Sequence, residues 1–134
     1  MKPLFADTSF YVALLNPHDV AHARALRAGE RFHRSVLLSD FILLELGNAL
    51  SGAGQRRLFS KLVARLRSDP NVRIVAASRD LLEQGLQLFS SRADKEWSLT
   101  DCTSFAIMQK EGLIDALTTD HHFAQAGFTV LLGE

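Results

Sequence analysis

The amino-acid sequence predicts an α/β protein, a three-layer α/β/α domain with a central parallel sheet, formed by residues 1–134 as a single unit. Short apolar segments alternate along the chain with longer segments of helical periodicity, and most of the short segments are continuously apolar. Strands that are apolar on both faces are typical of parallel sheets covered by helices on both sides. A chain of 134 residues is also long enough to bury one core of this kind.

The first half of the chain contains helices that end at recognisable signals. The helix over 9–15 stops before Pro17, because the residue preceding a proline disfavours the helical conformation. Ser39 caps the helix over 40–50, which ends near Gly52. The complete set predicted here is a strand over 2–6, helices over 9–15 and 18–34, a strand over 36–38 and a helix over 40–50.

The second half continues the alternation. The helix over 55–67 repeats leucine and valine at helical spacing. Ser98 and Asp101 form a capping-box-like start for the helix over 99–110, which Gly112 ends. The remaining elements are a strand over 72–76 after a turn at 69–71, a helix over 78–91, a polar loop over 92–97, a strand over 116–119, a helix over 120–125 and a strand over 128–132.

The composition excludes several classes of protein. With 47% hydrophobic and 22% charged residues the chain is not intrinsically disordered, and one cysteine excludes a disulfide framework. No apolar run approaches the roughly 18 residues that span a bilayer. Asp7 interrupts the apolar N-terminal segment, which makes it a poor signal peptide. We therefore expect a cytoplasmic protein without a membrane partner.

The net charge of zero conceals an uneven distribution. Residues up to 92 contain 13 Lys and Arg against 8 Asp and Glu, a net of +5, whereas later residues contain 2 against 7, a net of −5. This division fits an anionic substrate held near a metal site. Taken alone, the sums favour the simpler interpretation, an uneven solvated surface.

Four carboxylates occupy positions where carboxylates are unusual. Asp7 and Asp120 each follow a predicted strand, Glu45 lies within the apolar segment 41–46, and Asp101 is in the first turn of a helix. The apolar surroundings of Glu45 predict that its helix is largely buried. In parallel α/β sheets, ligands bind outside the carboxyl ends of the strands, so Asp7 and Asp120 should point to one edge.

Carboxylates gathered in one cleft repel each other, and a divalent cation removes that repulsion. Oxygen ligands without thiolates favour Mg²⁺ or Mn²⁺ over zinc. Structural roles remain open as well: Asp7 and Asp120 could cap helices, and Asp101 could balance a helix dipole. Glu45 lies in mid-helix, where its structural alternative is a buried partner such as an arginine.

Two C-terminal segments carry a distinctive motif, DKEWSLTDCTSF over 94–105 and ALTTDHHF over 116–123 followed by AGF over 126–128. Together with DTSF over 7–10 and with Glu45 in its apolar helix, they resemble the PIN-domain nucleases, and among these the VapC-type toxins. The resemblance covers essentially the whole chain in order and spacing.

The resemblance implies a parallel sheet of five strands, a Mg²⁺- or Mn²⁺-dependent endoribonuclease, a homodimer, and a small antitoxin that blocks the cleft. Asp7, Glu45, Asp101 and Asp120 match the family's acidic positions, and Asp94 matches a less central one. Asp7 and Asp101 would ligate the first metal ion, while Glu45 and Asp120 would complete the site, partly through water or a second ion.

Weaker candidates surround these acids. Thr8 and Ser98 would orient water or ligands, and Asn48 shares a helix face with Glu45. Arg92 and Lys95 flank the acidic motif and are candidates for RNA contacts. A broader set of basic residues could hold the RNA backbone or form a solvated surface: Arg24, Arg27, Arg56, Arg57, Lys61 and Arg65.

The remaining polar and aromatic residues of the motifs are expected to be structural. His121 and His122 are expected at the surface or behind the ligands rather than on the phosphate. Trp97 is expected to pack against the domain rather than stack on a base, and Cys102 to be a packed thiol rather than a nucleophile.

Two other classes remain open. A metal-dependent phosphatase could form an aspartyl-phosphate at Asp7, although Thr8 and Ser9 follow where a second Asp is typical. A receiver-like regulatory or binding domain would need a late lysine, and no lysine follows Lys110. Exposed apolar faces, if the helices near residues 10–15 and 41–50 leave any, would be covered by a partner helix or a second copy of the chain.

Overall fold

The computed structural model describes residues 1–133 and contains a five-stranded parallel sheet with the order β3-β2-β1-β4-β5. Phe5 in the central strand lies opposite both Leu37 and Ala116, so this strand pairs on both sides. The strands are β1 (Leu4–Ala6), β2 (Val36–Ser39), β3 (Val72–Val75), β4 (Asp115–Leu117) and β5 (Thr129–Val130). The predicted parallel sheet is confirmed.

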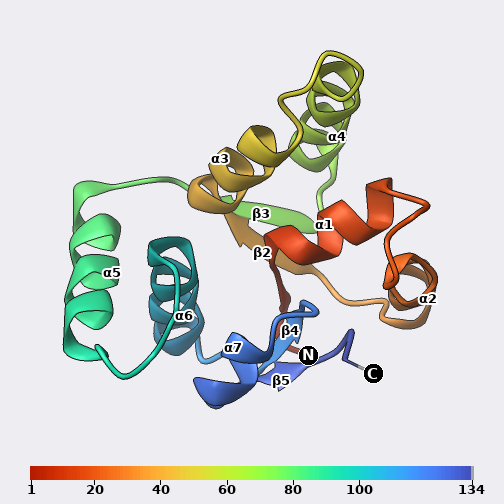
Figure 1. Cartoon of the computed structure of the whole chain (residues 1–134). Helices are drawn as coiled ribbons and strands as arrows, with labels where there is room; N and C mark the ends of the chain where they lie inside the picture. Colours follow the sequence, from red (N-terminus) through yellow and green to blue (C-terminus); the bar gives the residue numbers. More distant parts are fainter. Residues whose placement is uncertain (134) are drawn as a thin grey trace.

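Helices cover the sheet on both sides, as expected for a three-layer domain. Figure 1 shows α5 and α6 side by side on one side of the sheet, α1 and α2 on the other, and α4 beyond α3 at the top. The helices are α1 (Thr8–Leu15), α2 (His22–Arg31), α3 (Asp40–Ala49), α4 (Arg56–Ser68), α5 (Arg79–Ser91), α6 (Leu99–Glu111) and α7 (His121–Gln125). Within residues 1–133, none of these helices combines the length and apolar character needed to cross a membrane.

The core is continuous from the central strand to α6 and α7. All three residues of β1 are buried, which explains its uninterrupted apolar sequence. The Phe105 ring makes edge-on contacts with Trp97 and Phe123 at centroid distances of 5.0 and 4.9 Å. Trp97 also donates a hydrogen bond of 3.0 Å to Gln125, and Cys102 is fully buried. The side chains of Trp97 and Cys102 are thus packed in the domain.

Helices α5 and α6 approach closely at one glycine. A Cβ atom at Gly85 would lie 2.6 Å from Thr103 Cγ2, closer than atoms can pack. Because α6 carries Asp101, this contact fixes the position of a candidate site residue relative to the rest of the fold.

Several elements are shorter than the sequence predicted. The helix expected over 18–34 is observed only from His22 to Arg31. The preceding residues form a turn, because the Asn16 and Asp19 side chains accept hydrogen bonds from the backbone of His18 and Ala21. The last strand has two residues, since only Thr129 and Val130 pair with β4.

Candidate active site

A pocket of about 440 Å³ opens at the carboxyl edge of the sheet. Asp7 follows β1 directly, and its backbone N–H donates to Leu117 O of β4 at 3.0 Å. The strand that follows β1 in the sequence, β2, lies on one side of the β1–β4 pair, and the strand that follows β4, β5, lies on the other side. Parallel α/β sheets bind ligands at the carboxyl ends of two strands related in this way. The lining residues come from four helices and from connecting segments: Asp7, Thr8, Ser9, Val12, Asp19, Glu45, Glu96, Ser98, Asp101, Thr119, Asp120 and His122.

Asp7 is the most buried carboxylate of the pocket, with 4% of its surface exposed. Burial raises its pKa from 3.8 to about 6, and the charge of Asp101 adds to this, although hydrogen bonds from Thr118 and Ser9 oppose the shift. Thr118 Oγ1 donates to Asp7 Oδ2 at 2.7 Å and Ser9 Oγ donates to the same oxygen at 2.9 Å. These hydroxyls fix the orientation of the carboxylate.

Asp101 is held at the start of α6 by a capping box. Its backbone N–H donates to Ser98 Oγ at 3.0 Å, and its Oδ2 accepts from Ser98 N–H at 3.1 Å. Burial raises the pKa of Asp101, and the charge of Asp120 contributes, while hydrogen bonds from Ser98 and His122 lower it. The residue therefore has the structural role that the sequence left open, and it also lines the pocket.

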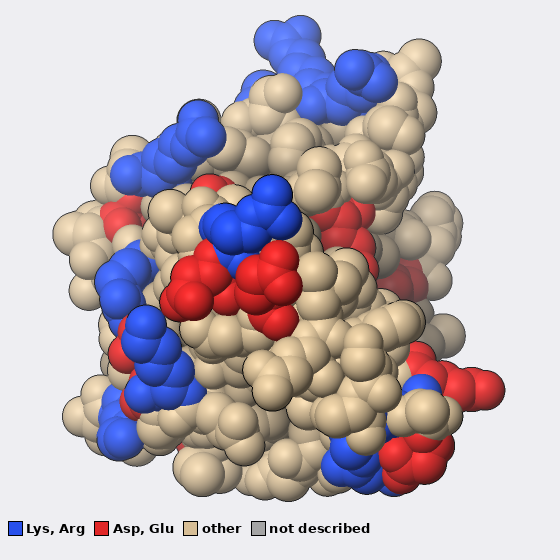
Figure 2. Space-filling model, turned by 90° about the vertical axis from the view of Figure 1, so that its left-hand side faces the viewer, with Lys and Arg blue, Asp and Glu red and all other residues tan. Residues whose placement is uncertain are grey.

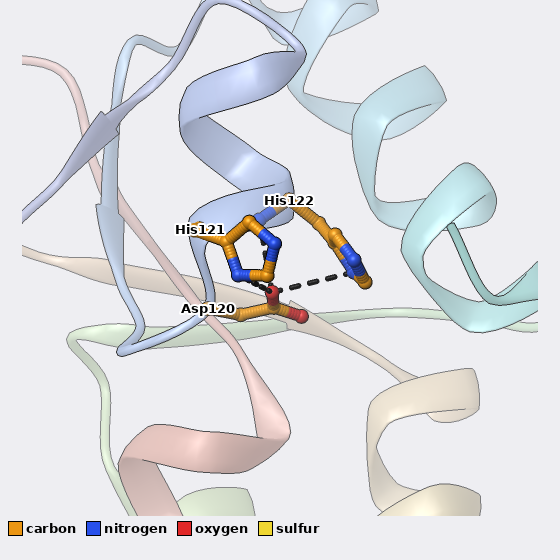
Figure 3. A group of neighbouring side chains, drawn as sticks. All are labelled: Asp120, His121 and His122. Carbon is orange, nitrogen blue, oxygen red and sulfur yellow. Dashed lines mark hydrogen bonds and ion pairs between the residues drawn. The ribbon is translucent and has the colours of Figure 1, made fainter. Parts of the chain in front are cut away.

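Asp120 and His122 form a second hydrogen-bonded group beside Asp101. Asp120 Oδ1 accepts from His122 N–H at 2.9 Å and so caps α7. The His122 ring nitrogen Nδ1 lies 3.2 Å from Asp101 Oδ2 and 3.3 Å from Asp120 Oδ1, so the imidazole bridges two carboxylates. Figure 3 shows both histidine rings beside the Asp120 carboxylate. This bridge holds the two acids at a defined separation.

His121 differs from its neighbour. Its Nδ1 is 3.8 Å from Asp120 Oδ1, and 76% of its side chain is exposed. One ligand atom from each of Asp120, His121 and His122 can be chosen so that all lie within 4.8 Å of one another. A mixed nitrogen and oxygen set of this kind could hold a divalent transition metal, whereas the carboxylates alone suit Mg²⁺ or Mn²⁺.

Glu45 reaches the pocket from α3. The expectation that this helix is largely buried was wrong, because only one side of it, with Ile42, Leu43 and Leu46, faces the core. Leu44 is 63% exposed and Glu45 is half-buried. Within residues 1–133 Glu45 has no ion pair, so the buried arginine considered as its structural alternative is not found.

Thr8 and Ser98 also line the pocket, as the sequence suggested. The Ser98 hydroxyl is occupied by the capping box. The Thr8 hydroxyl is buried and has no hydrogen-bond partner within residues 1–133. A buried hydroxyl without a partner at a pocket wall marks a place where a ligand or water is expected.

Four predicted site residues lie outside this pocket. Asn48 is exposed further along α3. Arg92 and Asp94 engage each other through two hydrogen bonds of 3.0 Å, and the pKa of Asp94 falls to about 2 because of its partner. Arg92 and Lys95 line a separate hollow of about 490 Å³ that shares only Glu96 with the acidic pocket.

Sequence reasoning did not identify two further carboxylates of the pocket. Asp19 lies in the turn before α2, where its Oδ1 accepts a hydrogen bond from the backbone N–H of Ala21. Glu96 lies in the loop before α6, two residues ahead of the Ser98 cap. Ser9 and Thr118 were also missed as partners of Asp7, although both lie within three residues of a strand end.

The pocket is strongly acidic. Six carboxylates line it with one histidine, and neither lysine nor arginine is among its lining residues. Such a set can bind a divalent cation through oxygen ligands. It would repel an anionic substrate unless a cation is bound.

Comparison with known proteins assigns the chain to a family. The model of the PIN domain matches residues 4–129, nearly the whole chain. The protein belongs to the PIN-domain family.

One relative is similar over nearly its full length. The 23S rRNA-specific endonuclease VapC20 of Mycobacterium tuberculosis is 34% identical over 126 residues, which are 93% of this chain and 95% of the relative. The crystal structure of VapC20, described as a sarcin-ricin loop cleaving toxin, matches with a TM-score of 0.85 and 32% identity over 94% of this chain and 96% of that one.

Two more distant structures share the fold. A toxin–antitoxin complex from Klebsiella pneumoniae matches with a TM-score of 0.69 and 16% identity over 98% of this chain and 99% of that one. FitAcB from Neisseria gonorrhoeae matches with a TM-score of 0.69 and 21% identity over 95% of both chains.

Proposed function

We propose that this protein is a divalent-metal-dependent endoribonuclease and the toxin of a toxin–antitoxin pair, with residues 1–134 forming one nuclease unit. The observation that carries the proposal is the convergence of Asp7, Glu45, Asp101 and Asp120 on one pocket at the carboxyl edge of the sheet. These residues come from four separate parts of the sequence, and Glu45 has no ion pair within residues 1–133.

The substrate proposal rests on the relative. VapC20 is named as an endonuclease specific for 23S rRNA and as a toxin that cleaves the sarcin-ricin loop. A structured ribosomal RNA is therefore the first substrate to test for this chain. Such a target would place the protein in the cytoplasm, where ribosomes are found.

The residues of the pocket fit a divalent cation. They offer carboxylate oxygens, the unpartnered hydroxyl of Thr8 and no thiolate. We assign Asp7 and Asp101 as direct ligands, with Glu45 and Asp120 completing the site and Mg²⁺ or Mn²⁺ as the ion. A bound ion of this kind lowers the pKa of a coordinated water and offsets negative charge on the phosphate.

The chain's own residues orient these ligands. Ser9 and Thr118 hold one oxygen of Asp7. His122 bridges Asp101 and Asp120, and the capping box keeps Asp101 at the start of α6. Groups behind the ligands matter because they fix ligand orientation without being consumed in the reaction.

An antitoxin and a second copy of this chain are the proposed protein partners. Leu44 is 63% exposed beside Glu45, and Val12 lies at the pocket wall, so a protein segment that blocked the site would find apolar contacts next to the carboxylates.

The test is cleavage of RNA by the purified protein with Mg²⁺ or Mn²⁺ and then with EDTA. We expect discrete fragments that need the metal and that disappear in Asp7→Asn and Asp101→Asn. Asp80→Asn, on the exposed side of α5, is the matched control and should cleave like the wild type. Hydrolysis of small phosphate esters without RNA cleavage would favour the phosphatase alternative, and metal binding without either activity would favour a binding domain.

A further inference from the structure

Helix α4 carries an unusual concentration of positive charge. Five of its 13 residues are basic, and none is acidic. None of the ion pairs found within residues 1–133 includes a residue of α4. Figure 2 shows basic side chains gathered at the top of the molecule, where Figure 1 places α4. The five residues are Arg56, Arg57, Lys61, Arg65 and Arg67.

Three of these residues form a ridge on the solvent side of the helix. Arg57, Lys61 and Arg65 are spaced four residues apart, and all are exposed. Residues at this spacing lie above one another on one helix face. With a rise of about 1.5 Å per residue the ridge is about 12 Å long. We call these three residues the α4 ridge.

The α4 ridge is held rigidly relative to the candidate site. Phe59 on the inner side of α4 packs against Gly47 of α3, where an added Cβ would lie 3.1 Å from the ring. Gly47 is two residues from Glu45, which lines the acidic pocket. A ligand bound by the α4 ridge would therefore be positioned with respect to the pocket.

Part of this positive charge opposes the stability of the helix that carries it. Like charges four residues apart repel each other. Arg56 and Arg57 lie in the first turn, which has no acidic residue, so they face the positive end of the helix dipole, whereas Arg65 and Arg67 in the last turn face its favourable negative end. A polyanion bound along the helix would offset the repulsion between these basic side chains.

The acidic pocket shows why such a surface is needed. It is lined by six carboxylates and by no lysine or arginine, so its own side chains repel a nucleic acid and only a bound cation would offset that repulsion. Many of the other arginines are engaged in pairs: Arg34 with Asp115, Arg73 with Glu111, Arg79 with Glu83 and Arg92 with Asp94. The affinity for RNA must come from basic residues outside the pocket.

We propose that the α4 ridge binds the phosphate backbone of the substrate RNA at a distance from the bond that is cleaved. The inference deepens the proposed ribonuclease function and rests on it. It assigns α4 the role of a sequence-independent electrostatic anchor, whereas the pocket supplies the chemistry.

Binding can be tested without cleavage, in EDTA, with a fluorescent sarcin-ricin stem-loop RNA. The test variant is Arg57→Gln/Lys61→Gln/Arg65→Gln. The control is Arg31→Gln/Arg79→Gln/Lys110→Gln, which removes the same charge from three exposed positions on other helices. We expect the ridge variant to bind at least about tenfold more weakly than the control, with the slope of log affinity against log salt reduced by about 2 to 3.

Equal affinities and equal salt slopes for the two triple variants would overturn the proposal. The proposal would also fail if the ridge substitutions weakened binding of polyglutamate but left RNA binding unchanged. That result would assign α4 to an acidic protein partner. Circular dichroism of both variants confirms that α4 remains folded.

Kinetics separate this inference from the proposed function. With Mg²⁺ or Mn²⁺ present, the ridge variant should show a raised KM and little change in kcat, since the α4 ridge contacts RNA equally before and during cleavage. Wild-type binding through α4 without cleavage would remove the ribonuclease proposal and leave the anchor. Cleavage by the ridge variant with the KM of the control would remove the anchor and leave the ribonuclease.

Discussion

The acidic pocket and helix α4 carry opposite charges, but each concentrates charges of one sign. The pocket gathers six carboxylates without lysine or arginine, and α4 gathers five basic residues without an acid. In both places like charges lie close together, and their mutual repulsion lowers the stability of the folded chain. The comparison indicates that each region is arranged for something the protein binds, a cation in the pocket and a polyanion on α4, rather than for the stability of the chain.

The largest effect is expected on catalysis. Glu45→Gln should lower the rate of RNA cleavage by about a thousandfold, because it removes a carboxylate that the pocket offers to the metal. Folding should be little changed, since Glu45 has no ion pair within residues 1–133. Single-turnover cleavage measures the effect, with Glu30→Gln on exposed α2 as the control. Equal rates for the two variants would exclude Glu45 from the site.

The carboxylate of Asp7, a proposed metal ligand, should destabilise the metal-free protein. The pKa of Asp7 is about 6 when folded and 3.8 ordinarily, so the folded state holds its proton more tightly. Its contribution to stability is complete below about pH 4 and is lost as the pH rises through about 6, a change of about 3 kcal/mol. Asp7→Asn should therefore be more stable than the wild type by about that amount near pH 8 in EDTA.

Urea unfolding as a function of pH measures this difference. The advantage of Asp7→Asn should shrink towards zero as the pH falls from about 6 to about 4, because the wild-type carboxyl becomes protonated in the folded state. An advantage that does not change with pH would mean that the substitution acts through packing instead.

Metal binding should favour the wild type over Asp7→Asn in stability. At a concentration of Mn²⁺ about a hundredfold above its dissociation constant, the wild type should gain about 2.7 kcal/mol of stability. Asp7→Asn and Asp101→Asn should gain much less, because each has lost a proposed ligand. The melting temperature with and without Mn²⁺ reports the gain, and an equal gain in all three proteins would place the ion elsewhere.

The smallest effect is expected on α4. Removing the α4 ridge charges should raise the stability of the protein by about 0.5 kcal/mol at low salt, because repulsion between neighbouring ridge charges disappears, while the opposite dipole effects of Arg57 and Arg65 at the two helix ends offset each other. The gain should fall as salt screens the charges. A loss of stability would show that these side chains make favourable contacts, and the parallel between the two regions would then fail.

The sequence was most informative where local chemistry decides the structure. Ser39, Ser78 and Ser98 cap α3, α5 and α6, each by accepting a backbone hydrogen bond. Such caps depend on a few neighbouring residues, so they can be identified from sequence. The burial of α3 could not, because the exposure of Leu44 depends on which neighbours cover the helix.

The residues of the candidate site also divide into those that local sequence features identify and those that they do not. Asp7 and Asp120 were located by their positions after strands, and Asp101 by its capping box. Asp19 and Glu96 were missed because they lie in connections whose paths depend on tertiary packing. The contact of His122 with Asp101 joins residues 21 positions apart and has no local signature.

The sequence by itself predicted the parallel sheet and the places of Asp7 and Asp120 at the ends of its strands, because apolar strands and the polar residues that follow them are local features of the chain. It also contained the positive charge of α4, which is visible in any count of the segment. Only the tertiary structure decided which charges find partners. It paired Arg34 with Asp115, left Glu45 and the α4 ridge without ion pairs among the described residues, and brought Asp19 and Glu96 to the same pocket. Electrostatic energies depend on distance in space and on burial, and neither can be read from separation along the chain.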